Sequence, residues 1–163
     1  MIELLKRPVV IPGKVPSMVN IGMNWRVARI PTEKIKNPVT LKKKQTYDYA
    51  MGWRDLAVFL LHAEAKAQAP AGTAVFVHVV FAFKPAKGRD NAADLAQDID
   101  NGQKCLLDAI QKSGLVANDK QIVTLFIEKV CAAAETQATV RSVAAARPRD
   151  KRRWLAGLTL EGG

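Results

Sequence analysis

Hydrophobic residues recur along the chain with two different periods, which predict its main helices and strands. Residues 73–83 carry valine or phenylalanine at alternate positions from Val75 onward, the pattern of a strand with one buried face. Residues 42–68 carry apolar side chains at helical spacing instead, and Pro70 and Gly72 follow as helix-ending residues. The expected buried stripe of this long helix consists of Tyr47, Met51, Leu56, Phe59, Leu60 and Ala63.

A second, shorter helix is expected over about residues 101–113, with Gly114 as its end. Its buried stripe should contain Ile99, Leu106 and Ile110, flanked by Cys105 and Ala109. Residues 21–30 are moderately strand-like, and the Pro and Lys content of residues 31–39 predicts a loop. The remaining predicted strands are residues 9–11, 121–130 and 136–143.

The length of 163 residues and the 48% hydrophobic content favour one domain, taken as residues 1–145, followed by a basic tail at 146–163. The net charge of +10 is unevenly distributed. Residues 1–54 contain eleven Lys or Arg and three acids. Residues 55–140 contain eight Lys or Arg and ten acids. An acidic centre between basic ends suits a polyanionic partner held around a metal, although charge alone fits a merely soluble basic protein equally well.

No stretch has the pattern of a signal peptide or a membrane span, so a cytoplasmic protein without membrane association is expected. The longest apolar run, residues 74–83, has strand length and contains His78, which is interpreted as a packed or solvated side chain. Cys105 and Cys131 lie far apart on segments that look buried. They are interpreted as core thiols of a reduced compartment.

The candidate chemistry is concentrated in one acidic stretch. Asp98 and Asp100 point the same way if the backbone is extended there, and Lys104 follows Asp100 by one helical turn. Asp119 stands at the entrance to a predicted strand, and would return beside the start of the preceding helix if that strand lies alongside it. A purely structural alternative is helix capping by Asp100 and an ion pair between Lys104 and Asp108. For Asp108 itself, that structural role is the expected one.

Three carboxylates and a lysine suit the hydrolysis of a phosphodiester. Mg²⁺ is held in proteins by a few carboxylates and keeps several of its waters, and it generates hydroxide while neutralising phosphate charge. Asp98, Asp100 and Asp119 supply such ligands, and Lys104 can offset charge that develops on the phosphate. No group of Cys or His residues suggests a covalent nucleophile or a zinc site.

The motif Asp98-x-Asp100-Asn101-x-x-Lys104, followed by Asp108-x-Ile110 and by Asn118-Asp119-x-Gln121, resembles the RusA family of Holliday junction resolvases. Pro16, Ser17 and Asn20 also resemble an N-terminal element of that family. The sequence departs from the family pattern in three places. Asn118 stands where the family often has an acid, and Gly102 where a larger apolar residue is usual. The segments before residue 70 and after residue 145 are long, which leaves the substrate preference open.

The resemblance implies that Asp98, Asp100 and Asp119 are metal-binding catalytic acids and that Lys104 is the catalytic lysine. It implies Mg²⁺ as cofactor, with Mn²⁺ as a substitute, and four-way junction or other branched DNA as partner. It also implies an α+β fold in a single domain, with a small mixed sheet packed against two main helices, and a homodimer.

Candidate DNA contacts lie outside the motif. Arg26, Arg29 and the basic run Lys42, Lys43 and Lys44 suit a phosphate backbone, with the alternative that Trp25 packs in the core and the arginines are solvated. Two rival functions stay open. One is a non-catalytic basic DNA-binding module, and the other is a nucleotide-sugar transferase, in which a D-x-D motif also holds a metal.

Overall fold

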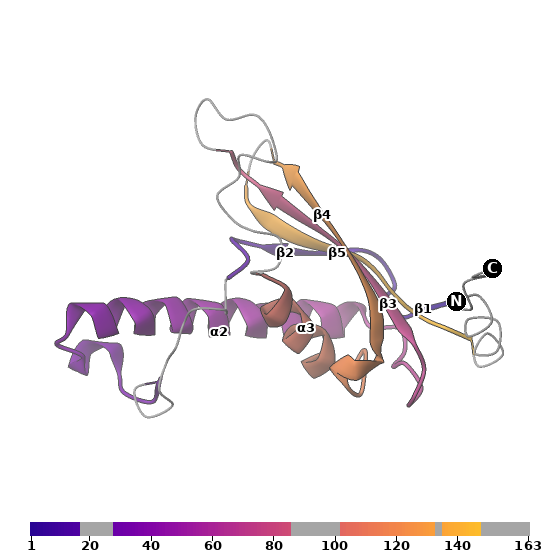
Figure 1. The fold of residues 1–163 in the computed structure, drawn as a ribbon, viewed down its shortest axis with the longest axis horizontal. Coiled ribbons are helices and arrows are strands. Elements are labelled where there is room, and N and C mark those ends of the chain that lie inside the picture. The colour runs from indigo at the N-terminus through magenta and orange to yellow at the C-terminus, as the bar shows by residue number, and fades with distance from the viewer. Residues whose placement is uncertain (17–27, 86–101, 133–134, 148–163) are drawn as a thin grey trace, which may run out of the picture.

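A computed structural model describes residues 1–16, 28–85, 102–132 and 135–147. A five-stranded mixed sheet packs against two main helices, which is the α+β fold that was predicted (Figure 1). The strands are β1 (Ile2–Glu3), β2 (Val9–Pro12), β3 (Val75–Phe83), β4 (Ile122–Cys131) and β5 (Gln137–Ala145). The helices are α2 (Pro38–Glu64) and α3 (Gln103–Lys112), with short 3-10 turns at η1 (Thr32–Lys34) and η4 (Asp119–Gln121).

The sheet order is β1-β5-β3-β4, and β2 pairs with β5 further along the edge that β1 occupies. β3 pairs parallel to β4 and antiparallel to β5, so it is the central strand. Its valines and phenylalanines at alternate positions are buried, as the period-2 pattern predicted. His78 points to the opposite face, where its Nε2 lies 2.6 Å from Oε1 of Glu128 on β4.

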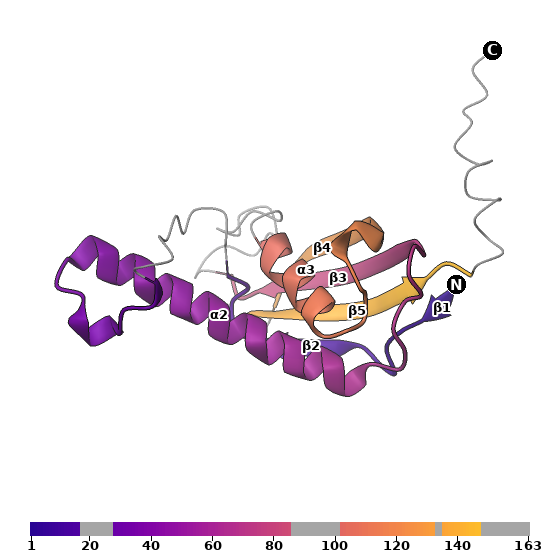
Figure 2. The ribbon, with the colours of Figure 1, turned by 90° about the horizontal axis from the view of Figure 1, so that it is seen from below.

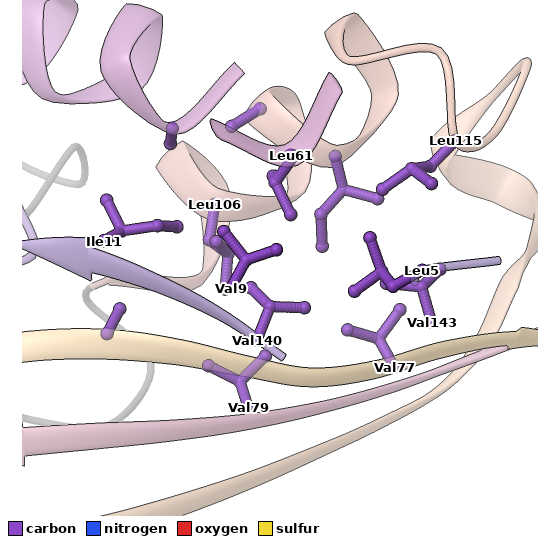
Figure 3. Close-up of a cluster of buried hydrophobic side chains, with 14 of the residues drawn as sticks. Leu5, Val9, Ile11, Leu61, Val77, Val79, Leu106, Leu115, Val140 and Val143 are labelled. Carbon is purple, nitrogen blue, oxygen red and sulfur yellow. The ribbon is translucent and has the colours of Figure 1, made fainter. Parts of the chain in front are cut away.

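Both α2 and α3 lie on one face of the sheet (Figure 2). The core fills the space between these helices and that face, where leucines from α2 and α3 meet valines of β2, β3 and β5 (Figure 3). The buried stripe predicted for α3 is confirmed for Cys105, Leu106, Ala109 and Ile110, which are all buried, and Ile99 lies outside the described residues. Among the described residues, no helix combines the length and apolar character needed to cross a bilayer.

α2 begins and ends four residues earlier than predicted. The Asn37 side chain caps its start by accepting hydrogen bonds from the backbone N–H groups of Val39 and Thr40, at 3.0 and 3.1 Å, and Pro38 occupies the first turn. The loop predicted for residues 31–39 is therefore wrong in part, since it contains η1 and this helix start. Of the strand-like segment 21–30, residues 21–27 lie outside the described residues, and residues 28–30 are not a strand.

The face that α2 buries also differs from the predicted stripe. Its buried apolar residues are Ala50, Trp53, Ala57 and Leu61, while Leu56 is 40% exposed and Phe59 69% exposed. Trp53 donates its indole N–H to the carbonyl oxygen of Pro12 at 3.1 Å, which ties the helix to the end of β2. Ala50 and Ala57 at the contact let the helix approach its neighbours closely, and they separate the two large buried residues, Trp53 and Leu61.

Candidate active site

Of the four predicted catalytic residues, Lys104 and Asp119 belong to the described part of the chain, and Asp98 and Asp100 lie outside it. Lys104 is exposed in the first turn of α3. Within the described part of the chain, no hydrogen bond or ion pair engages its ammonium group, and the structural alternative, an ion pair with Asp108, is not formed. Its charge is therefore not neutralised by any side chain that the structure describes.

The start of α3 is fixed by close packing at Gly102 rather than by a side-chain cap. A Cβ atom on this buried glycine would lie 2.5 Å from Cγ1 of Val15 and 3.4 Å from the ring of Phe81. The backbone at Gly102 has an ordinary helical conformation, so the requirement is for space. This contact explains why glycine replaces the larger residue expected inside the motif, and it sets where Lys104 begins its helix.

Replacing Gly102 with alanine should therefore destabilise the fold by about 1–3 kcal/mol, because Val15 must move to admit the methyl group. The double variant Gly102→Ala, Val15→Ala should lose less stability than the two single changes together, since the second change removes the obstructing atoms. Urea unfolding of the four proteins measures this coupling. Additive losses would show that the contact does not position α3.

Asp119 opens η4, which a reciprocal cap holds in place. The Asn118 side chain accepts a hydrogen bond from the backbone N–H of Lys120 at 2.9 Å, and Oε1 of Gln121 accepts from the backbone N–H of Asn118 at 3.3 Å and from that of Ala117 at 2.9 Å. The buried Gln121 also donates to the carbonyl oxygen of Pro70 at 2.8 Å. Asn118 thus has a structural role as the cap of η4, a role that an aspartate at this position could also fill.

The sequence analysis did not predict this capping box, although the spacing of Asn118 and Gln121 is typical of one. Its effect is to direct the Asp119 side chain outward, because the neighbouring polar side chains are used in the turn. Asp119 is exposed, and no described residue forms an ion pair or hydrogen bond with its carboxylate. In this Asp119 resembles Lys104, whose ammonium group also has no partner in the described ranges.

One chain does not bring Lys104 and Asp119 together. The ten residues of α3 span about 15 Å, with Lys104 in the first turn and Asp119 beyond the last. Figure 1 shows α3 running toward the end of the sheet where β3 and β4 both begin. Asp119 therefore does not return beside the start of the helix, because β4 is parallel to β3 and starts at the opposite end.

A comparison with protein-family models decides the family. The model described as Endodeoxyribonuclease RusA matches residues 30–141, more than two thirds of the chain. The chain belongs to the RusA endodeoxyribonuclease family. The match runs from η1 through most of β5, so it includes the acidic stretch, Lys104 and Asp119. No curated protein matches the sequence.

The basic residues predicted to contact DNA differ in how they are placed. Arg29, Lys42 and Lys43 are exposed, whereas Arg26 lies outside the described residues. Lys44 is only 7% exposed and forms an ion pair with Asp48, whose other carboxylate oxygen accepts a hydrogen bond from Thr32. Lys44 therefore links α2 to η1, and the exposed positive charge in this run comes from Lys42 and Lys43.

The chemistry of the donors fits a hard divalent cation. Among the described residues, no three His, Cys, Asp or Glu side chains converge, so Asp119 is the one predicted ligand whose place is known. Carboxylate oxygen is the donor that Mg²⁺ prefers. Burial raises the pKa of the Cys105 thiol to about 11, which keeps it protonated and makes it a poor metal ligand. Cys131, expected to be buried, is exposed at the end of β4.

Proposed function

We propose that this protein is a Mg²⁺-dependent, structure-specific endonuclease that resolves four-way DNA junctions by paired phosphodiester hydrolysis in recombination and repair. The observation that carries the proposal is that Lys104 and Asp119, both inside the RusA match, are exposed and have no partner among the described residues. Lys104 forms no ion pair with Asp108, and the Asp119 carboxylate caps no helix among these residues, so neither has a structural role that would compete with ligand binding.

The chain's own groups have distinct roles in this proposal. Asp98, Asp100 and Asp119 hold Mg²⁺, which when bound neutralises phosphate charge and provides hydroxide. Lys104 places its ammonium group beside the scissile phosphate and offsets charge on a phosphate oxygen or the leaving oxygen. The packing of Gly102 against Val15 and Phe81 holds the helix that carries this lysine.

The working unit is a homodimer, and each site takes Asp119 from the second copy. Lys104 and Asp119 of one chain are separated by the length of α3, about 15 Å, which is too far for both to contact the same phosphate. A two-fold arrangement in which the two copies of α3 run antiparallel reverses these ends, so each chain supplies what the other lacks. Two such sites suit the paired cuts that junction resolution requires.

The basic surface holds the DNA backbone without reading bases. With +10 per chain, the dimer carries +20, and exposed residues such as Lys42 and Lys43 neutralise phosphates. Affinity should fall steeply as salt is added, because binding releases condensed counterions. Phosphate contacts carry no direct base information, so selectivity arises from how the two basic surfaces are disposed around the junction.

A cleavage assay with Mg²⁺ on a four-way junction, a fork and a linear duplex of matched sequence tests the proposal. We expect paired nicks in the junction and little cutting of the duplex. Equal cutting of all three would overturn junction specificity. Tight junction binding with no cutting under any divalent metal would instead identify a non-catalytic DNA-binding module.

Lys104→Ala should lower the cleavage rate about 100-fold, in line with the loss of one group that stabilises transition-state charge. Junction affinity should change far less, because one lysine is a small part of a large basic footprint. Single-turnover rates and a gel-shift titration separate the two effects, and Lys43→Ala is the matched control for a binding lysine. Parallel losses of rate and affinity in Lys104→Ala would make it a binding residue only.

A further inference from the structure

The turn from Gly13 to Val15, which follows β2, is held between α2 and the start of α3. Tyr49 on α2 donates its hydroxyl hydrogen to the carbonyl oxygen of Lys14 at 2.6 Å. Gly13 has a φ of 87°, a left-handed conformation that favours glycine. On the other side, Val15 is fully buried and packs so closely on Gly102 that a Cβ atom there would lie 2.5 Å from its Cγ1. The backbone of Lys14 is therefore fixed relative to both helices.

The sheet places this turn at the end where β3 finishes. Pro12 of β2 and Ala82 of β3 both lie opposite Gln137 of β5, so the two strands end together. The ring of Phe81 also borders the space beside Gly102, since a Cβ atom there would lie 3.4 Å from it. The ends of β2 and β3 thus meet the start of α3, although the three elements are far apart in the sequence.

These contacts carry Lys14 to the predicted catalytic residues. Gly102 follows Asp100 by two residues and precedes Lys104 by two, so the chain itself keeps both within about 7 Å of Gly102, measured between Cα atoms. Lys14 is exposed, and its ammonium group forms no ion pair with any side chain that the structure describes. The turn therefore brings a second lysine to the start of α3.

We propose that Lys14 is a second cationic residue of the candidate active site, that it binds a DNA phosphate next to the scissile one, and that Tyr49 positions it. This inference rests on the proposed function, which supplies the DNA. Lys104 follows the acids on α3 and offsets charge at the scissile phosphate. Lys14 holds a neighbouring phosphate from a different segment of the chain. The strand is then fixed at two points, which aligns the scissile phosphate for attack.

Tyr49 suits a positioning role because its hydrogen bond fixes backbone at the surface. Its side chain is 47% exposed, so it adds little buried apolar area to the core. Partial burial raises the pKa of Tyr49 above its usual range, so the hydroxyl stays protonated and donates at neutral pH. A fixed backbone leaves Lys14 less conformational freedom to lose when its side chain binds a phosphate.

A junction with one neutral methylphosphonate linkage in place of a phosphate tests the contact made by Lys14. On the unmodified junction, Lys14→Ala should lower kcat/KM about 10-fold, as expected for the loss of one charged hydrogen bond. The neutral linkage is moved through the positions on either side of the cut. At one of them the wild type should also be slowed and Lys14→Ala should cost nothing further, because the contact is already lost. Lys43→Ala is the matched control, and its effect should be the same with every linkage.

Tyr49→Phe separates positioning from folding, because it removes only the hydrogen-bond donor. It should lower kcat/KM about threefold when Lys14 is present and have no effect in the Lys14→Ala background. Melting curves check that the fold is kept in each variant. Lys14→Arg should recover most of the activity lost in Lys14→Ala, since either cation neutralises a phosphate. A Tyr49→Phe loss that is undiminished without Lys14 would overturn the positioning role.

Failure of this inference is distinguishable from failure of the proposed function. A wild-type protein that cuts junctions, together with a Lys14→Ala effect that persists with every neutral linkage near the cut, would overturn the contact alone. A Lys14→Ala protein that cuts as well as the wild type would do the same. A wild-type protein that binds junctions and cuts none with any divalent metal would overturn the proposed function, and this inference with it.

Discussion

A mixture of Asp98→Asn and Asp119→Asn chains is expected to regain nicking activity that neither variant has alone. Each change removes metal-binding charge and adds nothing that repels DNA, so each pure variant should bind junctions and not cut them. In a mixed dimer, one site receives both defects. The other site combines intact Asp98, Asp100 and Lys104 from one chain with intact Asp119 from the other.

Random assortment makes half of the dimers mixed, each with one working site, so site number should recover to about a quarter of wild type. A cruciform plasmid provides the readout, because one working site gives nicked circles where the wild-type dimer gives linear DNA. Asp98→Asn mixed with Asp100→Asn is the matched control. Both changes fall in the same half of the site, so that mixture should stay inactive. Inactivity of the first mixture as well, after verified subunit exchange, would place all four residues in one chain.

The sequence predicted the parts of the fold in which large apolar residues recur with a clear period. β3 and α3 bury the residues expected of them, because Val75 to Phe83 and Leu106 with Ile110 face a core that needs their volume. The same reasoning gives the wrong buried face for α2, because the face that contacts the core contains Ala50 and Ala57. Small residues let the helix pack closely, and side-chain size then indicates the wrong face.

The position of Asp119 was misjudged for a topological reason. β3, α3 and β4 form a crossover between parallel strands, and such a unit returns the chain to the end of the sheet from which it started. A residue at the entrance to β4 must then lie far from the start of α3. If β3 and β4 were antiparallel, Asp119 would lie beside the start of α3, as the sequence analysis expected. Periodicity alone does not distinguish these cases, because strand direction depends on the whole sheet.

Removal of divalent metal should abolish cleavage and leave junction binding largely intact. In the proposed function the acids do not hold DNA, since the exposed Lys42 and Lys43 and the other basic residues supply that attraction. Mg²⁺ or Mn²⁺ should restore cutting to a chelated and dialysed protein. Ca²⁺ should restore none, because it takes more oxygen ligands at longer distances and so does not set the attack geometry.

Ca²⁺ is nevertheless expected to strengthen binding at the acidic centre, since it neutralises the carboxylates that repel the scissile phosphate. A gel-shift titration of a four-way junction with and without Ca²⁺ measures this, and Asp119→Asn is the matched control. Removing one carboxylate should reduce the Ca²⁺ effect on affinity and raise the metal-free affinity slightly, because one charge that repels the phosphate is lost. Cutting that persists in excess chelator would show that the carboxylates act without a metal, and a Ca²⁺ effect equal in wild type and Asp119→Asn would remove Asp119 from the metal site.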